Sequence, residues 1–255
     1  MSRILITGAS RGIGRGVAEE LSARGHEVIA TARDASTLAD VPAVARLLLD
    51  VTDESSVSAA VAAAGPVDAL VSNAGATVRA PMETVPVAEV QRLFDLNTFG
   101  ALRVAQAVMP GMRERGTGKL IFISSIQGRI AIPLIGPYAA SKWALEAIAE
   151  TLAIEAAHFG ISVQLLQPAA VSSGGAERAK VFLDDTNPYR PLLDQMQGFR
   201  SAPITVHEVA RAVAQALEDD HAPLRTPVGD PATRALAARK AAPEDVPFLA
   251  APLDW

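Results

Sequence analysis

Short apolar runs alternate with stretches of helical period along most of this chain, and this alternation restricts the possible folds more than any other feature. The apolar runs occupy residues 3–7, 27–31, 45–49, 67–72, 119–124, 162–167 and 223–226. The helical stretches occupy residues 12–24, 53–64, 86–115, 138–159 and 205–219. Most of the runs are nonpolar on both faces, as strands covered by helices on both sides should be. Because the alternation is typical of βαβ units, we predict the α/β class, with a doubly wound, seven-stranded parallel sheet flanked by helices.

Chain length and breaks in the pattern predict the domain organisation. A length of 255 residues suits one large α/β domain, so we expect a single domain over residues 1–255. Residues from about 170 to 204 interrupt the alternation with Gly174-Gly175 and with a turn-forming stretch that ends at Pro188. We predict that this segment is a substrate flap and that a C-terminal tail begins at about residue 229.

Charge and residue usage exclude several classes of protein. The chain has 23 Lys and Arg against 28 Asp and Glu, a net charge of −5, and no run rich in Lys or Arg. We therefore expect no nucleic acid and no membrane as partner. The absence of cysteine excludes disulfides, a thiolate zinc site and a cysteine nucleophile. The four histidines do not pair at the spacing of metal ligands, so we expect no metal.

Segments that direct a chain to or through a membrane are not evident in the sequence. No stretch approaches the ~18 consecutive apolar residues of a membrane-spanning helix. No basic and apolar leader precedes the first predicted strand. From these features we expect a cytoplasmic protein.

A glycine-rich turn, Thr7-Gly8-Ala9-Ser10-Arg11-Gly12-Ile13-Gly14, follows the first predicted strand and leads into the first helix. Glycines there let the backbone approach a pyrophosphate, whose charge is met by the free N–H groups of the helix. A turn that merely requires small residues is the alternative interpretation. The position and spacing within a βαβ unit favour a dinucleotide site. The phosphate-binding lysine of a P-loop is missing, which argues against an ATPase.

Tyr138 and Lys142 lie four positions apart in a predicted helix, so both side chains share one face. A nearby ammonium is expected to lower the pKa of the phenol toward a range useful for proton transfer. A core tyrosine beside a lysine that reaches for solvent is the alternative. Ser125 follows a strand at the edge where doubly wound sheets bind ligands, and only one of Ser124 and Ser125 can face that edge.

Several motifs together resemble the short-chain dehydrogenase/reductase family. They are the T-G-x-x-x-G-x-G turn, Asn73-Ala74-Gly75, Asn97, Ser125, and Tyr138-Ala139-Ala140-Ser141-Lys142. The resemblance runs from about residue 3 to residue 229, and residues 223–229 are similar to the hydroxysteroid and retinol dehydrogenase branch. The chain departs at residues 168–173, where the family usually has Pro-Gly-x-Val-x-Thr. The resemblance implies a Rossmann fold, a nicotinamide dinucleotide and a dimer or tetramer.

The same resemblance implies roles for individual residues. Tyr138 would be the acid/base, Ser125 would donate to the substrate oxygen, Lys142 would hold the nicotinamide ribose, and Asn97 would hold a water that leads to the lysine. The cofactor would be bound by Tyr138, Lys142 and by Gly8, Ser10, Arg11, Gly12, Ile13, Gly14, Arg33, Asp50, Val51, Asn73, Ala74, Gly75, Pro168, Val171 and Ser173. For Asp50 the alternative role is a helix cap.

The end of the second predicted strand favours NADP(H) over NAD(H). Enzymes that select NAD commonly have an acid near this position, whereas a basic residue accommodates the 2′-phosphate of NADP. Here Ala32 occupies the acid position and Arg33 follows it, with Arg11 as a second cation. The alternative is that Arg33 is solvated and that Asp34 serves NAD.

These features predict an NADP(H)-dependent alcohol dehydrogenase or carbonyl reductase that transfers a hydride with tyrosine as acid/base. The alternatives are an NAD-dependent enzyme of the same family, a non-catalytic dinucleotide sensor, and a sugar-nucleotide isomerase or dehydratase, for whose extra domain the chain is too short. Arg129 and Arg190 could meet a substrate carboxylate. Apolar flap residues could instead receive a lipophilic carbonyl or alcohol: Val181, Phe182, Leu183, Tyr189, Leu192, Leu193, Met196 and Phe199.

Overall fold

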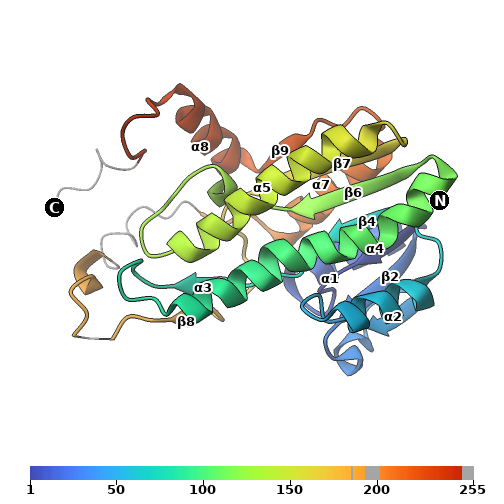
Figure 1. Ribbon diagram of the computed structural model, residues 1–255, viewed down its shortest axis with the longest axis horizontal. Coiled ribbons are helices and arrows are strands. Elements are labelled where there is room, and N and C mark those ends of the chain that lie inside the picture. Colours follow the sequence, from blue (N-terminus) through green and yellow to red (C-terminus); the bar gives the residue numbers. More distant parts are fainter. Residues whose placement is uncertain (185, 193–201, 249–255) are drawn as a thin grey trace.

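Seven parallel strands form the central sheet of the computed structural model, which describes residues 1–184, 186–192 and 202–248 (Figure 1). Their order is β3-β2-β1-β4-β6-β7-β9, so the chain winds outward from β1 in both directions. This confirms the predicted doubly wound parallel sheet. The strands are β1 (Arg3–Ile6), β2 (Glu27–Ala32), β3 (Ala45–Leu48), β4 (Ala69–Ser72), β6 (Gly118–Ile123), β7 (Ile161–Pro168) and β9 (Arg225–Val228).

Helices cover both faces of the sheet, and the alternation of strand residues divides the core between them. Ile4 and Ile6 pack toward α1 (Gly12–Ala23) and α7 (Val206–Glu218), whereas Leu5 packs toward the opposite face. That opposite face is covered by α2 (Glu54–Ala64), α4 (Gly100–Arg115) and α5 (Gly136–Ala157). Figure 1 shows α4 and α5 running side by side across the front of the sheet. Burial of both strand faces explains why the apolar runs do not alternate with polar residues.

The predicted helix over residues 86–115 is divided in the structure. It consists of α3 (Val87–Phe94), a π-helical turn η2 (Asp95–Phe99) and α4. At Gly100, where α4 begins, a Cβ atom would lie 2.6 Å from Cγ2 of Val51. The π turn inserts an extra residue into the helical repeat, so it changes the direction in which nearby side chains point.

Three further features differ from the predicted pattern. Strand β9 lies two residues later than predicted, and a short parallel pair joins β5 (Val78–Arg79) to β8 (Lys180–Val181). The predicted tail contains a helix, α8 (Asp230–Ala241), which begins with a proline in its first turn. Proline at that place is a helix-start signal that the sequence interpretation did not use. Two short 3₁₀ turns, η1 (Ala35–Leu38) and η3 (Ile126–Gly128), follow β2 and β6.

Candidate active site

The turn between β1 and α1 is packed so closely that side chains would not fit at its glycines. Gly8 and Gly12 have φ angles of +67° and +53°, a region that glycine tolerates and L-residues seldom adopt. A Cβ atom on Gly14 would lie 2.5 Å from Nδ2 of Asn73 and would also overlap the carbonyl oxygen of Gly8. A Cβ atom on Gly12 would lie 3.2 Å from the carbonyl oxygen of Ser173. The glycines therefore let three segments of chain meet at this turn.

Helix α1 begins in a way that suits an anion. Its first turn has no side-chain cap and no acidic residue, whereas α2 is capped by Asp53 and α7 by Thr205. The first N–H groups of a helix carry partial positive charge and bind phosphate well. In the same turn, Ser10 is half-buried and Ile13 packs against the core. The residues present thus fit the pyrophosphate of a dinucleotide.

The end of β2 presents cations rather than a free acid. Arg33 and Arg11 are both exposed, and in the described part of the chain no carboxylate pairs with either. Ala32 is buried. The carboxylate of Asp34 caps η1 and accepts from the backbone N and the hydroxyl of Ser36, at 3.0 and 2.7 Å, which lowers the pKa of Asp34. The acid that would serve NAD is therefore engaged in its own turn.

The loop after β4 is clamped to the glycine turn. The side-chain amide of Asn73 donates to the carbonyl oxygens of Thr7 and Gly8, at 3.0 and 3.2 Å. The backbone N–H groups of Asn73 and Ala74 both donate to the hydroxyl of Thr7, at 2.9 and 3.0 Å. Gly75 follows and is exposed. Thr7, which the sequence interpretation treated only as part of the motif, therefore organises this edge.

Asp50 caps the turn before α2, although the alternative interpretation had it cap the helix itself. Its Oδ1 accepts from the backbone N and the hydroxyl of Thr52, at 2.9 and 2.7 Å. The N-cap of α2 itself is Asp53, not Asp50. Val51 is buried beside Gly100. A contact between Asp50 and adenine stays a prediction.

Ser125, Tyr138 and Lys142 come together at the carboxyl end of β6. Ser125 follows that strand, and its side chain is hydrogen-bonded to Tyr138 at the start of α5. Lys142 is buried one turn along α5, with Nζ 5.8 Å from the centre of the Tyr138 ring. The same Nζ donates to the carbonyl oxygen of Ile123, at 2.8 Å. The three predicted catalytic side chains thus share one site at the edge of the sheet.

The expected effect of the lysine on the tyrosine is wrong for this structure. Burial raises the pKa of Tyr138 to about 12, and only the hydrogen bond with Ser125 opposes that change. Burial also lowers the pKa of Lys142 to about 8, partly offset by the carboxylate of Glu146. Desolvation disfavours both charged forms, and Lys142 is not among the groups that lower the pKa of Tyr138. At neutral pH the phenol therefore carries its proton and can act as an acid.

Ser124 faces away from the tyrosine. Its hydroxyl donates to Oε1 of Glu146 at 2.6 Å, in a buried contact. Because adjacent residues of an extended chain point in opposite directions, Ser125 is the one left to contact Tyr138. This geometry agrees with the expectation that only one of the two serines faces the site.

Asn97 lies in the π turn η2 and joins two parts of the site. Its side-chain amide donates to the carbonyl oxygen of Ala76 and to the hydroxyl of Ser141, at 2.9 and 3.0 Å. Its Oδ1 accepts from the backbone N of Ala76 at 2.9 Å. The side chain therefore connects the loop after β4 to α5, and a water held on the way to the lysine stays a prediction.

Of the predicted cofactor residues from the end of β7 onward, Ser173 lies against the glycine turn. Pro168 ends β7, and Val171 forms an isolated parallel bridge with Ile204. The close approach of the Ser173 carbonyl to Gly12 places this segment over the start of α1. Residues 168–173 differ from the family pattern, but the segment still packs against the glycine turn at the predicted site.

The predicted flap is attached to the site by backbone and side-chain contacts. The parallel pair β5·β8 joins it to the loop after β4, and the hydroxyl of Tyr189 donates to Glu83 at 2.6 Å. Leu183, Leu192 and Tyr189 pack with Leu134, which lies between the serine and the tyrosine in sequence. Val181 is exposed and Phe182 is half-buried. Leu193, Met196 and Phe199 lie outside the described residues.

Sequence reasoning missed an ion pair made by Glu146, a buried carboxylate on α5. Glu146 lies one turn beyond Lys142 on α5 and pairs with Arg225 of β9 at 2.7 Å. The one local signal for it was the position of Glu146 four residues after Lys142, which places both side chains on the same face of the helix. For its partner Arg225, 79 positions away in the sequence, no local signal existed.

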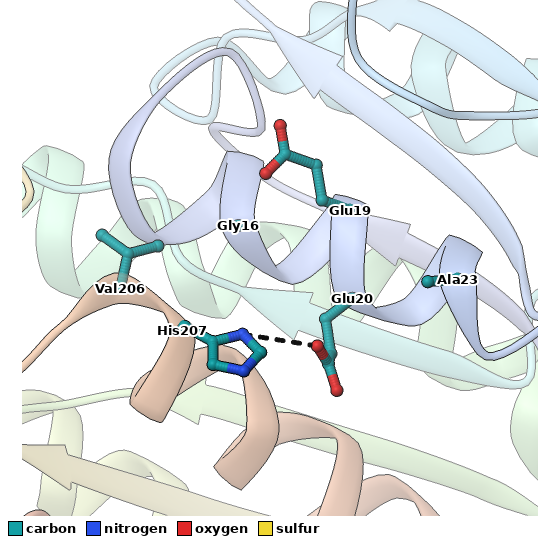
Figure 2. A pocket seen from close by; sticks show the side chains of 6 residues that line it. All are labelled: Gly16, Glu19, Glu20, Ala23, Val206 and His207. Carbon is teal, nitrogen blue, oxygen red and sulfur yellow. Dashed lines mark ion pairs between the residues drawn. The ribbon is translucent and has the colours of Figure 1, made fainter.

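A separate surface pocket lies between α1 and α7, lined by residues of which none belongs to the predicted site (Figure 2). His207 points toward Glu20 there, with Nδ1 3.6 Å from Oε2. The carboxylate of Glu20 is already paired with Arg24 at 2.8 Å.

Across residues 1–184, 186–192 and 202–248, no three His, Cys, Asp or Glu side chains are grouped so that they could hold a metal ion. Of the helices described, none has the length and apolar character needed to cross a bilayer.

Comparisons with known proteins identify similar chains. The sequence model described as "short chain dehydrogenase" matches residues 2–181. The 3-ketodihydrosphingosine reductase of Bacteroides thetaiotaomicron is 40% identical over 182 residues, which cover 70% of this chain and 67% of that protein. The human 17-beta-hydroxysteroid dehydrogenase type 1 is 34% identical over 248 residues, covering 87% of this chain and 76% of that protein.

Solved structures share the fold. A short chain dehydrogenase from Burkholderia cenocepacia J2315, in complex with NADP, superposes with a TM-score of 0.80. The match covers 94% of this chain and 93% of that chain, at 27% sequence identity. The similarity therefore extends over nearly the whole length of both chains.

Proposed function

Because this chain belongs to the short-chain dehydrogenase/reductase family, we propose that it is an NADP(H)-dependent oxidoreductase that interconverts a carbonyl and an alcohol. The observation that carries this proposal is the meeting of Ser125, Tyr138 and Lys142 at the carboxyl end of β6. When bound, the nicotinamide supplies or accepts the hydride. The remaining chemistry belongs to side chains of this chain.

Tyr138 is the proton donor for carbonyl reduction in this proposal. Its phenol is protonated at neutral pH because burial raises its pKa to about 12. A substrate oxygen that develops negative charge in the transition state would accept this proton, and the hydroxyl of Ser125 would stabilise the same oxygen. Lys142 would hold the nicotinamide ribose through its ammonium.

The choice of NADP(H) rests on the cations at the end of β2. Arg33 and Arg11 are exposed and without carboxylate partners among the described residues, so both guanidinium groups are available to a phosphate. Guanidinium and phosphate groups match in geometry as well as in charge. The engagement of Asp34 in its own turn argues against the NAD-dependent alternative.

Substitution of Tyr138 tests the mechanism. Tyr138→Phe removes the phenolic proton and keeps most of the ring packing, so single-turnover hydride transfer should fall by at least ~10²-fold with NADPH affinity nearly unchanged. Lys142→Met should reduce the rate and also weaken NADPH binding. The double variant should lose far less than the product of the two effects if both side chains act as one unit. A Tyr138→Phe rate above about a tenth of the unmutated rate would contradict the proposed acid.

We propose a lipophilic substrate on the basis of the flap. Leu183, Leu192 and Tyr189 pack with Leu134, which precedes Tyr138 by four residues, and Val181 exposes apolar surface on the flap. The 40% identical relative is, by its name, a reductase of a 3-keto compound. Following NADPH absorbance across a panel of ketones that differ in chain length and charge tests this choice. A preference for ketones that carry a carboxylate would instead indicate that Arg129 binds the substrate carboxylate. If no ketone reacts, the non-catalytic dinucleotide sensor is favoured.

We propose that the protein forms a dimer or tetramer through two helical segments, residues 87–109 of α3, η2 and α4, and residues 143–154 of α5. Helices α4 and α5 lie side by side on one face (Figure 1), and large apolar residues are exposed on α5 and just beyond its end. Ile154 is 76% exposed, and Trp143 and Phe159 are each more than 40% exposed. Exposed apolar groups concentrated on one helical face are typical of an association surface. Light scattering at assay concentration measures the assembly.

A further inference from the structure

Glu146 is a buried carboxylate that the proposed mechanism does not use. It lies on α5 and is 2% exposed. Its Oε1 accepts from the hydroxyl of Ser124 at 2.6 Å and from the side-chain amide of Gln167 at 3.0 Å. Its Oε2 accepts from Nε of Arg225 at 2.7 Å. One carboxylate thus connects α5 to β6, β7 and β9.

Stability alone is a weak explanation for this arrangement. Taking the Glu146 carboxylate out of water carries a large cost, which is offset only in part by a guanidinium that stays one-quarter exposed. Arg225 also pairs with Glu150 at 2.7 Å, so it has a second and more exposed partner. The buried position of Glu146 therefore requires another reason.

Glu146 contacts both segments that carry the proposed catalytic side chains. Ser124, which it binds, directly precedes Ser125 in the chain. A Cβ atom on Gly128 would lie 2.8 Å from Cγ of Glu146, so the turn η3 after Ser125 closes against this side chain. On the other side, Lys142 precedes Glu146 by one helical turn, and its Nζ is held by the carbonyl oxygen of Ile123.

We propose that Glu146 is a positioning residue for the active site: it holds the serine-bearing turn against α5 and keeps the buried ammonium of Lys142 charged. This inference rests on the proposed function for the importance of Lys142, but the electrostatic part can be measured without substrate. Glu146 itself does not touch the reacting atoms.

The charges around Lys142 support this role. Burial lowers the pKa of Lys142 to about 8, and the carboxylate of Glu146 is the group that raises it again. Strand β7 and turn η3 carry no titratable side chain, and Lys119 of β6 is held by the carbonyl oxygen of Leu217. The other titratable or charged groups on α5 and on the elements packed against it are Tyr138, Glu150, Glu155, Arg225, Arg129, Asp95 paired with Arg103, and Glu89 paired with Arg92.

A direct titration of the lysine tests the proposal. The chain contains four lysines, so a protein labelled with [ε-¹³C]lysine gives four NMR signals, and Lys142→Met identifies the one from Lys142. In Glu146→Gln the pKa of Lys142 should fall by about one, a tenfold change in its protonation ratio. The matched control is Glu150→Gln, which removes the other carboxylate on Arg225, and there the pKa should stay within about 0.3 of the unmutated value. An unchanged pKa in folded Glu146→Gln would refute the proposal.

The pH profile of ketone reduction separates positioning from simple structural damage. In Glu146→Gln the alkaline loss of single-turnover rate should move to lower pH by the same amount as the lysine titration. A contact that is only structural would lower the rate equally at every pH, which would contradict the proposal. Retained activity in Tyr138→Phe together with the expected lysine shift would instead refute the proposed function and leave the electrostatic role of Glu146 standing.

A second variant covers the case in which Glu146→Gln does not fold because Arg225 loses its buried partner. The double variant Glu146→Gln/Arg225→Met removes both charges of this pair and leaves only the half-exposed carboxylate of Glu150 without its partner. Glu146 affects the pKa of Lys142, whereas Arg225 is not among the groups that do. The pKa of Lys142 should therefore fall again in the double variant, and an unchanged or higher value would refute the proposal.

Discussion

Replacing Lys142 by methionine should make the cofactor-free protein more stable at pH 7. The side chain is 5% exposed, and burial lowers its pKa from the usual 10.5 to about 8. At 1.36 kcal/mol for each pKa unit, this corresponds to about 3 kcal/mol of unfavourable burial of the charged form. Methionine has a similar length, no charge and a flexible shape, so it can occupy the same space.

One lost hydrogen bond reduces this gain. The carbonyl oxygen of Ile123 loses its donor Nζ, at 2.8 Å, and leaving a buried acceptor unpaired costs about 1 to 2 kcal/mol. The expected net stabilisation is therefore about 1 to 2 kcal/mol. For a chain of this size that corresponds to a rise in Tm of roughly 2 to 8 °C. Thermal unfolding followed by circular dichroism measures it, with the exposed Lys240→Met as a control that should change little.

The stabilisation should depend on pH in a direction set by the lowered pKa. Below pH 8, Lys142 is protonated in both folded and unfolded protein, so the folded state bears the full burial cost. Between pH 8 and 10.5 the folded state releases the proton first, and the unmutated protein recovers stability as pH rises. The advantage of Lys142→Met should therefore shrink across this window. No advantage at pH 7, or the same advantage at pH 7 and pH 10, would refute the reasoning.

Three other substitutions give further tests. Arg33→Asp should reverse the cofactor preference from NADPH to NADH in fluorescence titrations, and equal affinities of the unmutated protein for both would contradict the proposed clamp. Gly14→Ala should weaken NADPH binding at least ~10-fold and lower Tm, because its Cβ atom would lie 2.5 Å from Nδ2 of Asn73 in a turn that cannot widen cheaply. Ile154→Glu, at a 76% exposed position, should shift the mass measured by light scattering toward that of the monomer, 26.6 kDa; an unmutated protein that already has this mass would refute the proposed assembly.

Local sequence signals were sufficient for the sheet and for the identity of the paired side chains. Strand and helix periodicity depends on residues a few positions apart, so the seven parallel strands could be predicted without tertiary information. The same holds for Tyr138 and Lys142, because a spacing of four residues places two side chains on one helical face. The division of the predicted helix at η2 could not be predicted in this way, since Asn97 and Gly100 there contact segments distant in the sequence.

The sequence determined which groups the site contains, but only the tertiary structure decided their charge states and partners. Proximity of Tyr138 and Lys142 predicted a lowered pKa for the phenol, whereas burial raises it to about 12. The carboxylate that supports the lysine is itself held by Gln167 and Arg225, from strands that follow α5 in the chain. The energy of a charge depends on how much water is removed from around it and on which dipoles replace that water. Those neighbours are brought together from distant parts of the chain only when the sheet and its covering helices assemble.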